Sequence, residues 1–171
     1  MAILDRWVAL TGRALSWLVT LLVLNTGLVV LLRYGFGIGN TALQELSTYL
    51  HASVFLLGAA WTLQRGGHVR VDIFYRNMSQ RAKAWVNALG TLIFLLPLCI
   101  YILVVSWDFA AASWAIRETS SEPGGLPFVY LLKSLIPLMA INLALAAVAE
   151  LLRSAMVLLT EPVQTSETAD G

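Results

Sequence analysis

The sequence predicts an all-α membrane protein with four transmembrane helices, both termini in the cytoplasm, and a short interfacial helix before the third span. Hydrophobic residues make up 58% of the 171 residues and charged residues only 12%, with a mean hydropathy of +0.77. A soluble domain keeps roughly a quarter of its residues charged. The apolar residues gather in four segments of about twenty residues, the length that a helix needs to cross the hydrocarbon core.

The predicted spans are residues 14–32, 42–63, 84–107 and 130–152. Tryptophans lie near their ends, as in the aromatic belts of membrane proteins, at Trp17, Trp61, Trp85 and Trp107. The first apolar stretch is too long for a signal peptide and no cleavage site follows it, so we expect a retained anchor. Residues 1–153 thus form one transmembrane domain, and the polar residues 154–171 form a cytoplasmic tail that we expect to be disordered.

Basic residues predict the orientation. Eight of the eleven lysines and arginines lie in the N-terminal segment, in the 64–83 loop and just after the fourth span. Only three lie on the other side, in or near residues 33–41 and 108–129. Because short cytoplasmic flanks carry the excess of Lys and Arg, we place both termini and the 64–83 loop inside. The even scatter of basic residues gives no footprint for nucleic acid.

The 64–83 loop contains a compact polar motif, in which valines alternate with His68, Arg70 and Asp72. Two potential ligands, with no cysteine or second histidine nearby, do not complete a metal site, so we expect no metal and no cofactor. We interpret the motif as a hydrogen-bonded turn in which Asp72 caps the interfacial helix over residues 73–83.

Polar residues inside the spans allow two interpretations. Asn25, His51 and Asn142 fall near the middle of their spans and could line an ion path or bond one helix to another. We favour bonds between helices because no acidic residue lies at that depth. Glu45 and Lys133 lie near the outer ends of spans two and four. They could pair with each other, or each could reach the interface or a partner protein.

The outer loop before span four reads "RETSSEPGGLP" over residues 117–127. Together with Glu45, "LGAA" at 57–60, "GGHVRVD" at 66–72 and the following Lys133, it resembles the small membrane subunit, the DctQ-type component, of tripartite ATP-independent periplasmic (TRAP) transporters. The matching motifs keep their order across roughly residues 12–152.

The resemblance implies a non-enzymatic subunit of the bacterial inner membrane that works in the lipid bilayer with two other proteins. A large membrane subunit of about a dozen spans uses a sodium gradient, and a periplasmic binding protein captures the solute, often an organic acid. The small subunit scaffolds the large one and helps to dock the binding protein. On this reading, the docking side carries Glu118, Ser120, Gly125 and Pro127.

Two other functions can be weighed against this one. A self-sufficient homodimeric transporter would couple ions through Glu45, the only acidic residue that could serve. A haem anchor would need two histidines at one depth, whereas His51 lies near the middle of a span and His68 lies outside it. The identity of the solute cannot be read from the chain.

Overall fold

The structure, a computed structural model, describes residues 2–64, 75 and 78–160. The predicted roles of His68, Arg70 and Asp72 therefore fall outside the described residues, as does most of the predicted interfacial helix. The elements in chain order are α1 (Ala2–Gly35), α2 (Thr41–Gln64), α4 (Gln80–Gly90), the π-helical turn η1 (Thr91–Leu95), α5 (Leu96–Ala115) and α6 (Val129–Thr160). Within these residues the fold is entirely helical.

Four helical segments are long and apolar enough to cross a membrane, which confirms the predicted all-α fold with four spans and places the chain among multi-pass membrane proteins. They are Leu15–Gly35, Thr41–Leu63, Gln80–Ala115 and Val129–Thr160. The third joins α4, η1 and α5 into one helix of 36 residues. At 1.5 Å per residue it is about 54 Å long, so its ends extend beyond a hydrocarbon core about 30 Å thick.

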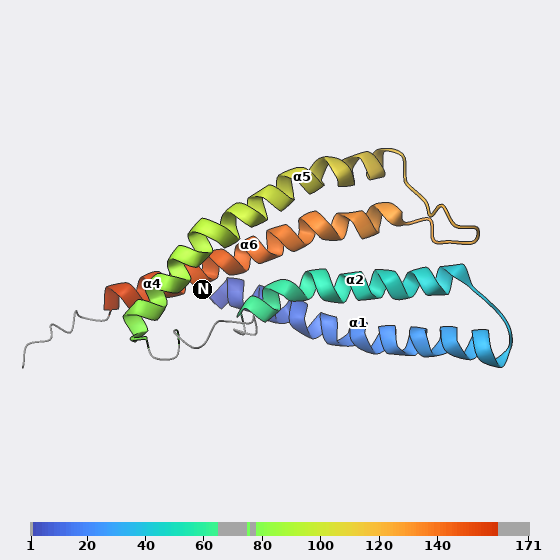
Figure 1. The fold of residues 1–171 in the computed structure, drawn as a ribbon, viewed down its shortest axis with the longest axis horizontal. Coiled ribbons are helices and arrows are strands. Elements are labelled where there is room, and N and C mark those ends of the chain that lie inside the picture. The colour runs from blue at the N-terminus through green and yellow to red at the C-terminus, as the bar shows by residue number, and fades with distance from the viewer. Residues whose placement is uncertain (1, 65–74, 76–77, 161–171) are drawn as a thin grey trace, which may run out of the picture.

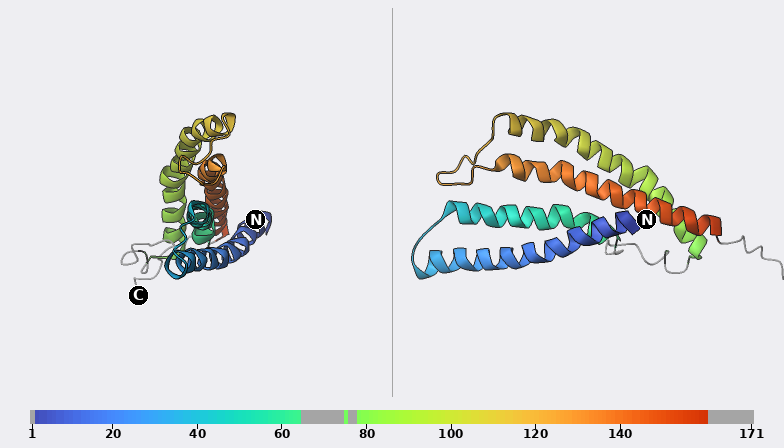
Figure 2. Two further views of the ribbon diagram at one scale, coloured as in Figure 1. Left: turned by 90° about the vertical axis from the view of Figure 1, so that its right-hand side faces the viewer. Right: turned by 180° about the vertical axis from the view of Figure 1, so that it is seen from behind.

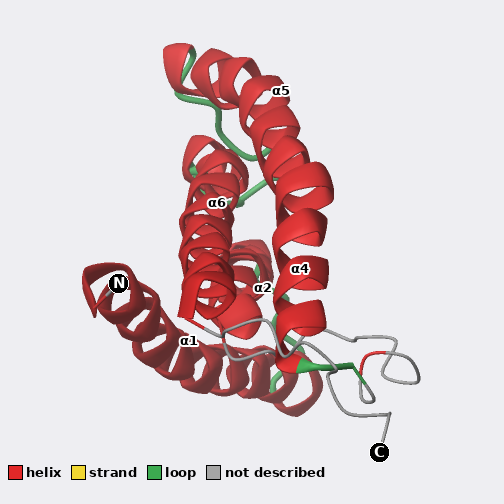
Figure 3. Ribbon diagram, turned by 90° about the vertical axis from the view of Figure 1, so that its left-hand side faces the viewer, coloured by secondary structure: helices red, strands yellow, loops and turns green. Residues whose placement is uncertain are grey.

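The helices lie side by side in a curved row, in the order α1, α2, α6, α5 (Figures 1 and 2). Along the direction of the helix axes, the α1–α2 and α5–α6 connections lie at the same end of the molecule, here called the loop end. The last turns of α6 and the start of α4, which packs against α6, lie at the opposite end of the helices, here called the tail end (Figure 3). Such a row leaves two broad faces that no helix of the described chain covers.

Small side chains form the contacts inside the row. Ala60 of α2 and Ala146 of α6 are 1% and 4% exposed and pack together. Ala140 and Ala147 of α6 are also buried. Small residues let helix backbones approach closely in a membrane, where apolar surface alone does not drive helices together. The larger apolar side chains point outward instead, for example Phe94, which is 74% exposed.

The third helix changes its hydrogen-bond pattern just before Pro97. Leu96 donates its N–H to the carbonyl of Thr91, five residues earlier, in the π-helical turn. Proline has no N–H to continue the regular pattern, and prolines and π turns are recognised causes of helix bending. The helix curves over α6 in Figure 1.

Several helix ends differ from the predicted ones. Ser79 caps α4 by accepting the N–H of Ala82 at 3.2 Å, so residues 80–83 belong to the long third helix. The described residues do not confirm the interfacial helix predicted over 73–83. At the C-terminal side, residues 154–160, which we had assigned to the tail, continue α6. They are mostly apolar and precede Pro162, the first residue that disfavours helix.

Candidate functional site

The loop between α5 and α6 begins with a strained residue. Arg117 has a φ of 48°, a left-handed conformation in which glycine is usual. Its N–H donates to the carbonyl of Trp114 at 3.2 Å, and the N–H of Glu118 donates to the carbonyl of Ser113 at 3.0 Å. These two bonds form a Schellman motif that ends α5 and turns the chain sharply.

The rest of the loop folds onto itself. Ser120 donates its N–H to the carbonyl of Leu126 at 3.1 Å, and Gly125 donates to the carbonyl of Glu122 at 3.0 Å. The N–H of Glu122 is bonded to the Ser120 hydroxyl at 3.1 Å. Gly124 adopts a φ of 75° that suits a residue without a side chain. Residues 120–126 therefore form a closed turn.

Glu45 attaches this turn to α2. One carboxylate oxygen accepts a short hydrogen bond from the Ser120 hydroxyl. The other accepts the backbone N–H of Leu126 at 2.6 Å. Hydrogen bonds to a carboxylate are roughly twice as strong as those between neutral groups. Both oxygens of Glu45 are thus bound to a segment about 75 residues further along the chain.

Lys133 attaches the same loop to α6. Its ammonium lies 2.6 Å from a carboxylate oxygen of Glu118 and 4.2 Å from the centre of the Phe109 ring on α5. The hydrogen bond from Lys133 lowers the pKa of the Glu118 carboxyl below its ordinary value. Both side chains are partly exposed, at 22% and 30%, so solvent weakens this pair.

The ion pair between Glu45 and Lys133 that the sequence left open does not form. The Schellman motif brings Glu118 back to Lys133, and the closed turn presents its donors to Glu45. We call these contacts the loop network, formed by Glu45, Glu118, Ser120, Leu126 and Lys133. It joins α2, α6 and the loop.

Gly125 completes the network by leaving space. A Cβ atom at this position would lie 2.6 Å from the Cβ of Ser120 and 2.7 Å from a carboxylate oxygen of Glu45. Pro127 is exposed at the end of the turn. Six of the nine residues that the sequence singles out therefore lie in or beside this loop, and the other three, His68, Arg70 and Asp72, lie outside the described residues.

The sequence did not point to the Leu126 amide, to Phe109, or to the bond from the Trp114 indole N–H to the Ser134 hydroxyl, 2.7 Å long. Every residue except proline carries a backbone N–H, so the residue type at position 126 does not indicate that its amide is a donor to Glu45. Trp114 falls in the predicted outer loop, and its partner could not be read from the pattern.

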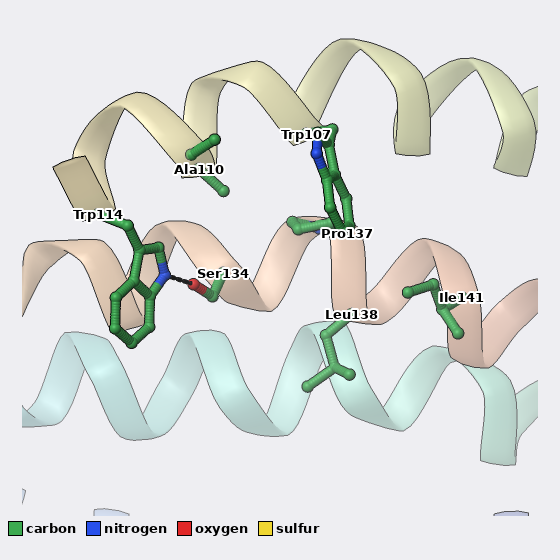
Figure 4. A pocket seen from close by; sticks show the side chains of 8 residues that line it. Trp107, Ala110, Trp114, Ser134, Pro137, Leu138 and Ile141 are labelled. Atoms are coloured by element: carbon green, nitrogen blue, oxygen red, sulfur yellow. Dashed lines mark hydrogen bonds between the residues drawn. The ribbon is translucent and has the colours of Figure 1, made fainter.

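An apolar groove of about 320 Å³ lies between α5 and α6 near the loop end. Figure 4 shows Trp107 over Pro137 and Trp114 turned toward Ser134. Leu138 and Ile141 also line the groove. Its lining holds no ionisable side chain.

The polar residues inside the spans mostly bond helices together, as we favoured. Asn25 of α1 donates to the carbonyl of Leu43 and to the hydroxyl of Ser47 on α2, both at 2.8 Å. Asn142 of α6 donates to the carbonyl of Leu57 at 3.4 Å. His51 differs, because it is exposed and stacks on Phe55 of its own helix with ring centres 6.5 Å apart.

A family model for the DctQ component of tripartite ATP-independent periplasmic transporters matches residues 22–156. The chain belongs to the DctQ family. The match includes the whole loop network and most of every spanning helix, and it makes the chain a small permease subunit of a TRAP transporter. In comparisons with curated proteins and with solved structures, no match was found.

Proposed function

We propose that this DctQ subunit is a scaffold of the bacterial inner membrane. It would hold a large membrane subunit of about a dozen spans and present a docking surface for the periplasmic solute-binding protein. The large subunit would carry out sodium-coupled uptake of an organic acid-type solute, and the small subunit would take no chemical part. The termini would lie in the cytoplasm, as the basic residues predict.

The loop network carries this proposal. A docking surface must keep its shape between encounters, because ordering a loose loop costs binding free energy. Here charge-assisted bonds to Glu45 and Lys133 hold the half-buried residues of the loop. The tip, which includes Ser121, Glu122 and Pro123, stays exposed. The loop is thus rigidly attached on one side and open to a partner on the other.

The row of helices supports the scaffold role. A transporter that carries its own solute needs a polar path, whereas the central helices α2 and α6 meet through alanines. The third helix exposes large apolar side chains, including Phe94, Tyr101 and Val104 at 74%, 66% and 64%. Such helix surfaces fit lipid or the helices of a larger subunit.

The hydrogen bonds that Glu45 accepts argue against the alternative function, a homodimeric transporter that couples ions through this residue. A coupling acid has to exchange its proton or ion during each cycle. Both oxygens of Glu45 accept hydrogen bonds from the loop, and releasing them would open the loop network at every turnover. Nothing in the described residues favours that function over the scaffold.

Co-purification tests the proposal. The tagged chain would be expressed with its neighbouring genes, extracted in mild detergent, and its partners identified by mass spectrometry. We expect one stoichiometric partner with about a dozen spans. Recovery of a homo-oligomer alone, in a preparation where the large protein is expressed and extracted, would contradict the scaffold role.

A further inference from the structure

A small polar cleft lies at the tail end, far from the loop network and outside the proposed function. It is formed between the first turns of α4 and the last turns of α6 and has a volume of about 120 Å³. Among the residues that the structure describes, its charged lining consists of Lys83, Glu150 and Arg153. Within that set, two cations face one carboxylate.

Hydrogen bonds within the cleft fix its shape. Asn87 donates to one oxygen of Glu150 at 3.2 Å, and Arg153 pairs with the other oxygen at 3.0 Å. Tyr75 donates its hydroxyl to the amide oxygen of Asn87 at 3.3 Å. The carboxylate is therefore paired with Arg153, and Lys83 is the second cation of the described lining, with its ammonium 5.5 Å from the centre of the Tyr75 ring.

Helix length places the cleft at the membrane surface. The third helix and α6 have 36 and 32 residues, or about 54 and 48 Å at 1.5 Å per residue. A bilayer measures about 30 Å across its hydrocarbon core and 40–45 Å with its head groups. The ends of both helices therefore reach the head-group layer. Trp85, which follows Ala84 of the cleft in the sequence, is 51% exposed, and exposed tryptophans are common at the level of the head groups.

We propose that this cleft binds the phosphate of an anionic phospholipid head group. Basic pockets between membrane helices attract such head groups, and each cation near the surface adds to the attraction. Lys83 would contact the phosphate, while the ion pair with Glu150 holds Arg153 in the wall. Ala84 and Val157 also line the cleft, so its apolar side can receive the glycerol and upper acyl carbons. An inorganic phosphate ion has no apolar part, so it would make no contact with this apolar side of the cleft.

Native mass spectrometry of the full-length protein, purified with its large partner where one is bound, tests the proposal. The delipidated sample would be titrated with phosphatidylglycerol, phosphatidylcholine or inorganic phosphate. We expect clear preference for phosphatidylglycerol. Lys83→Gln should weaken that binding roughly fivefold, from about 1 kcal/mol per cation near the surface. Arg33→Gln removes an exposed positive charge at the loop end and should leave binding unchanged.

Glu150→Gln separates binding from a purely structural role. It keeps the side-chain shape and removes the negative charge, so phosphatidylglycerol should bind more tightly than to the native chain. Equal binding of the two lipids would overturn the proposal, as would equal effects of Lys83→Gln and Arg33→Gln. Displacement of the lipid by inorganic phosphate at similar concentration would show a plain anion site and overturn the lipid assignment.

Discussion

Substitution of Gly125 by alanine should detach the loop from α2. The added methyl group would lie 2.6 Å from the Cβ of Ser120, whereas non-bonded carbons prefer about 3.5–4.0 Å. The turn must therefore move by roughly 1 Å. That movement would lengthen the bond from Leu126 to Glu45 from 2.6 Å to about 3.6 Å, beyond the hydrogen-bond range.

The expected effect is large enough to measure. Overpacking of this kind costs about 1–3 kcal/mol, and each 1.4 kcal/mol is a tenfold change in an opening equilibrium. Hydrogen–deuterium exchange should therefore show the Ser120 and Leu126 amides exchanging roughly 5- to 140-fold faster. Capture of the binding protein by the purified complex should fall in parallel.

A matched control lies at the same end of the molecule. Gly39 belongs to the α1–α2 connection, and a Cβ there would meet nothing within 4 Å. Gly39→Ala should leave both exchange and capture unchanged. Native protection of the Ser120 and Leu126 amides in Gly125→Ala would refute the claim that close packing of the loop on Glu45 holds it in place.

Three further substitutions test the loop network. Arg117→Gly should stabilise the protein by roughly 1 kcal/mol in thermal unfolding, because glycine adopts the left-handed conformation without strain. Glu45→Gln should loosen the loop, because the amide has only one acceptor oxygen for the two donors of Ser120 and Leu126; exchange of the Leu126 amide measures this. Because the folded state lowers the pKa of Glu118, its stabilising contribution is present above the ordinary glutamate value of roughly 4.3 and is lost as pH falls through the lower folded value. The native chain should therefore unfold at a higher temperature than Glu118→Gln at pH 7, and this difference should vanish in acid.

Each of these tests has a contradicting result. A less stable Arg117→Gly chain would mean that the arginine side chain contributes more than its backbone strain costs. Unchanged exchange in Glu45→Gln would show that the loop holds itself without α2. A difference between the native chain and Glu118→Gln that persists below the folded pKa would assign the stabilisation to packing and not to charge.

Hydropathy was sufficient to predict the four spans, because about twenty apolar residues in a row have few alternatives to crossing a bilayer. Helix ends were harder, because helices extend past the hydrocarbon core. The third helix continues from Trp107 to Ala115, and α6 reaches Thr160. The row arrangement could not be predicted, since lipid-facing and partner-facing positions are equally apolar.

The site was predicted in part. Glu45 and Lys133 stood out because charges near span ends require partners, and Glu118 was selected from the family resemblance of the outer loop. The pairing among them depends on the turn at Arg117, which requires a left-handed conformation at a residue type that gives no hint of it. The acceptor role of Glu45 depends on a backbone amide of the loop. Both features follow from loop geometry, which neither hydropathy nor charge spacing encodes.

Photo-crosslinking at the loop tip tests the central claim most directly. A photoreactive residue would replace the exposed Ser121 in the loop or, as a control, the exposed Thr160 at the end of α6. After irradiation of cells that express the whole system, Ser121 should capture the periplasmic solute-binding protein, and Thr160 should not. Capture of that protein from Thr160, or its absence at Ser121 when the complex is intact, would contradict the account.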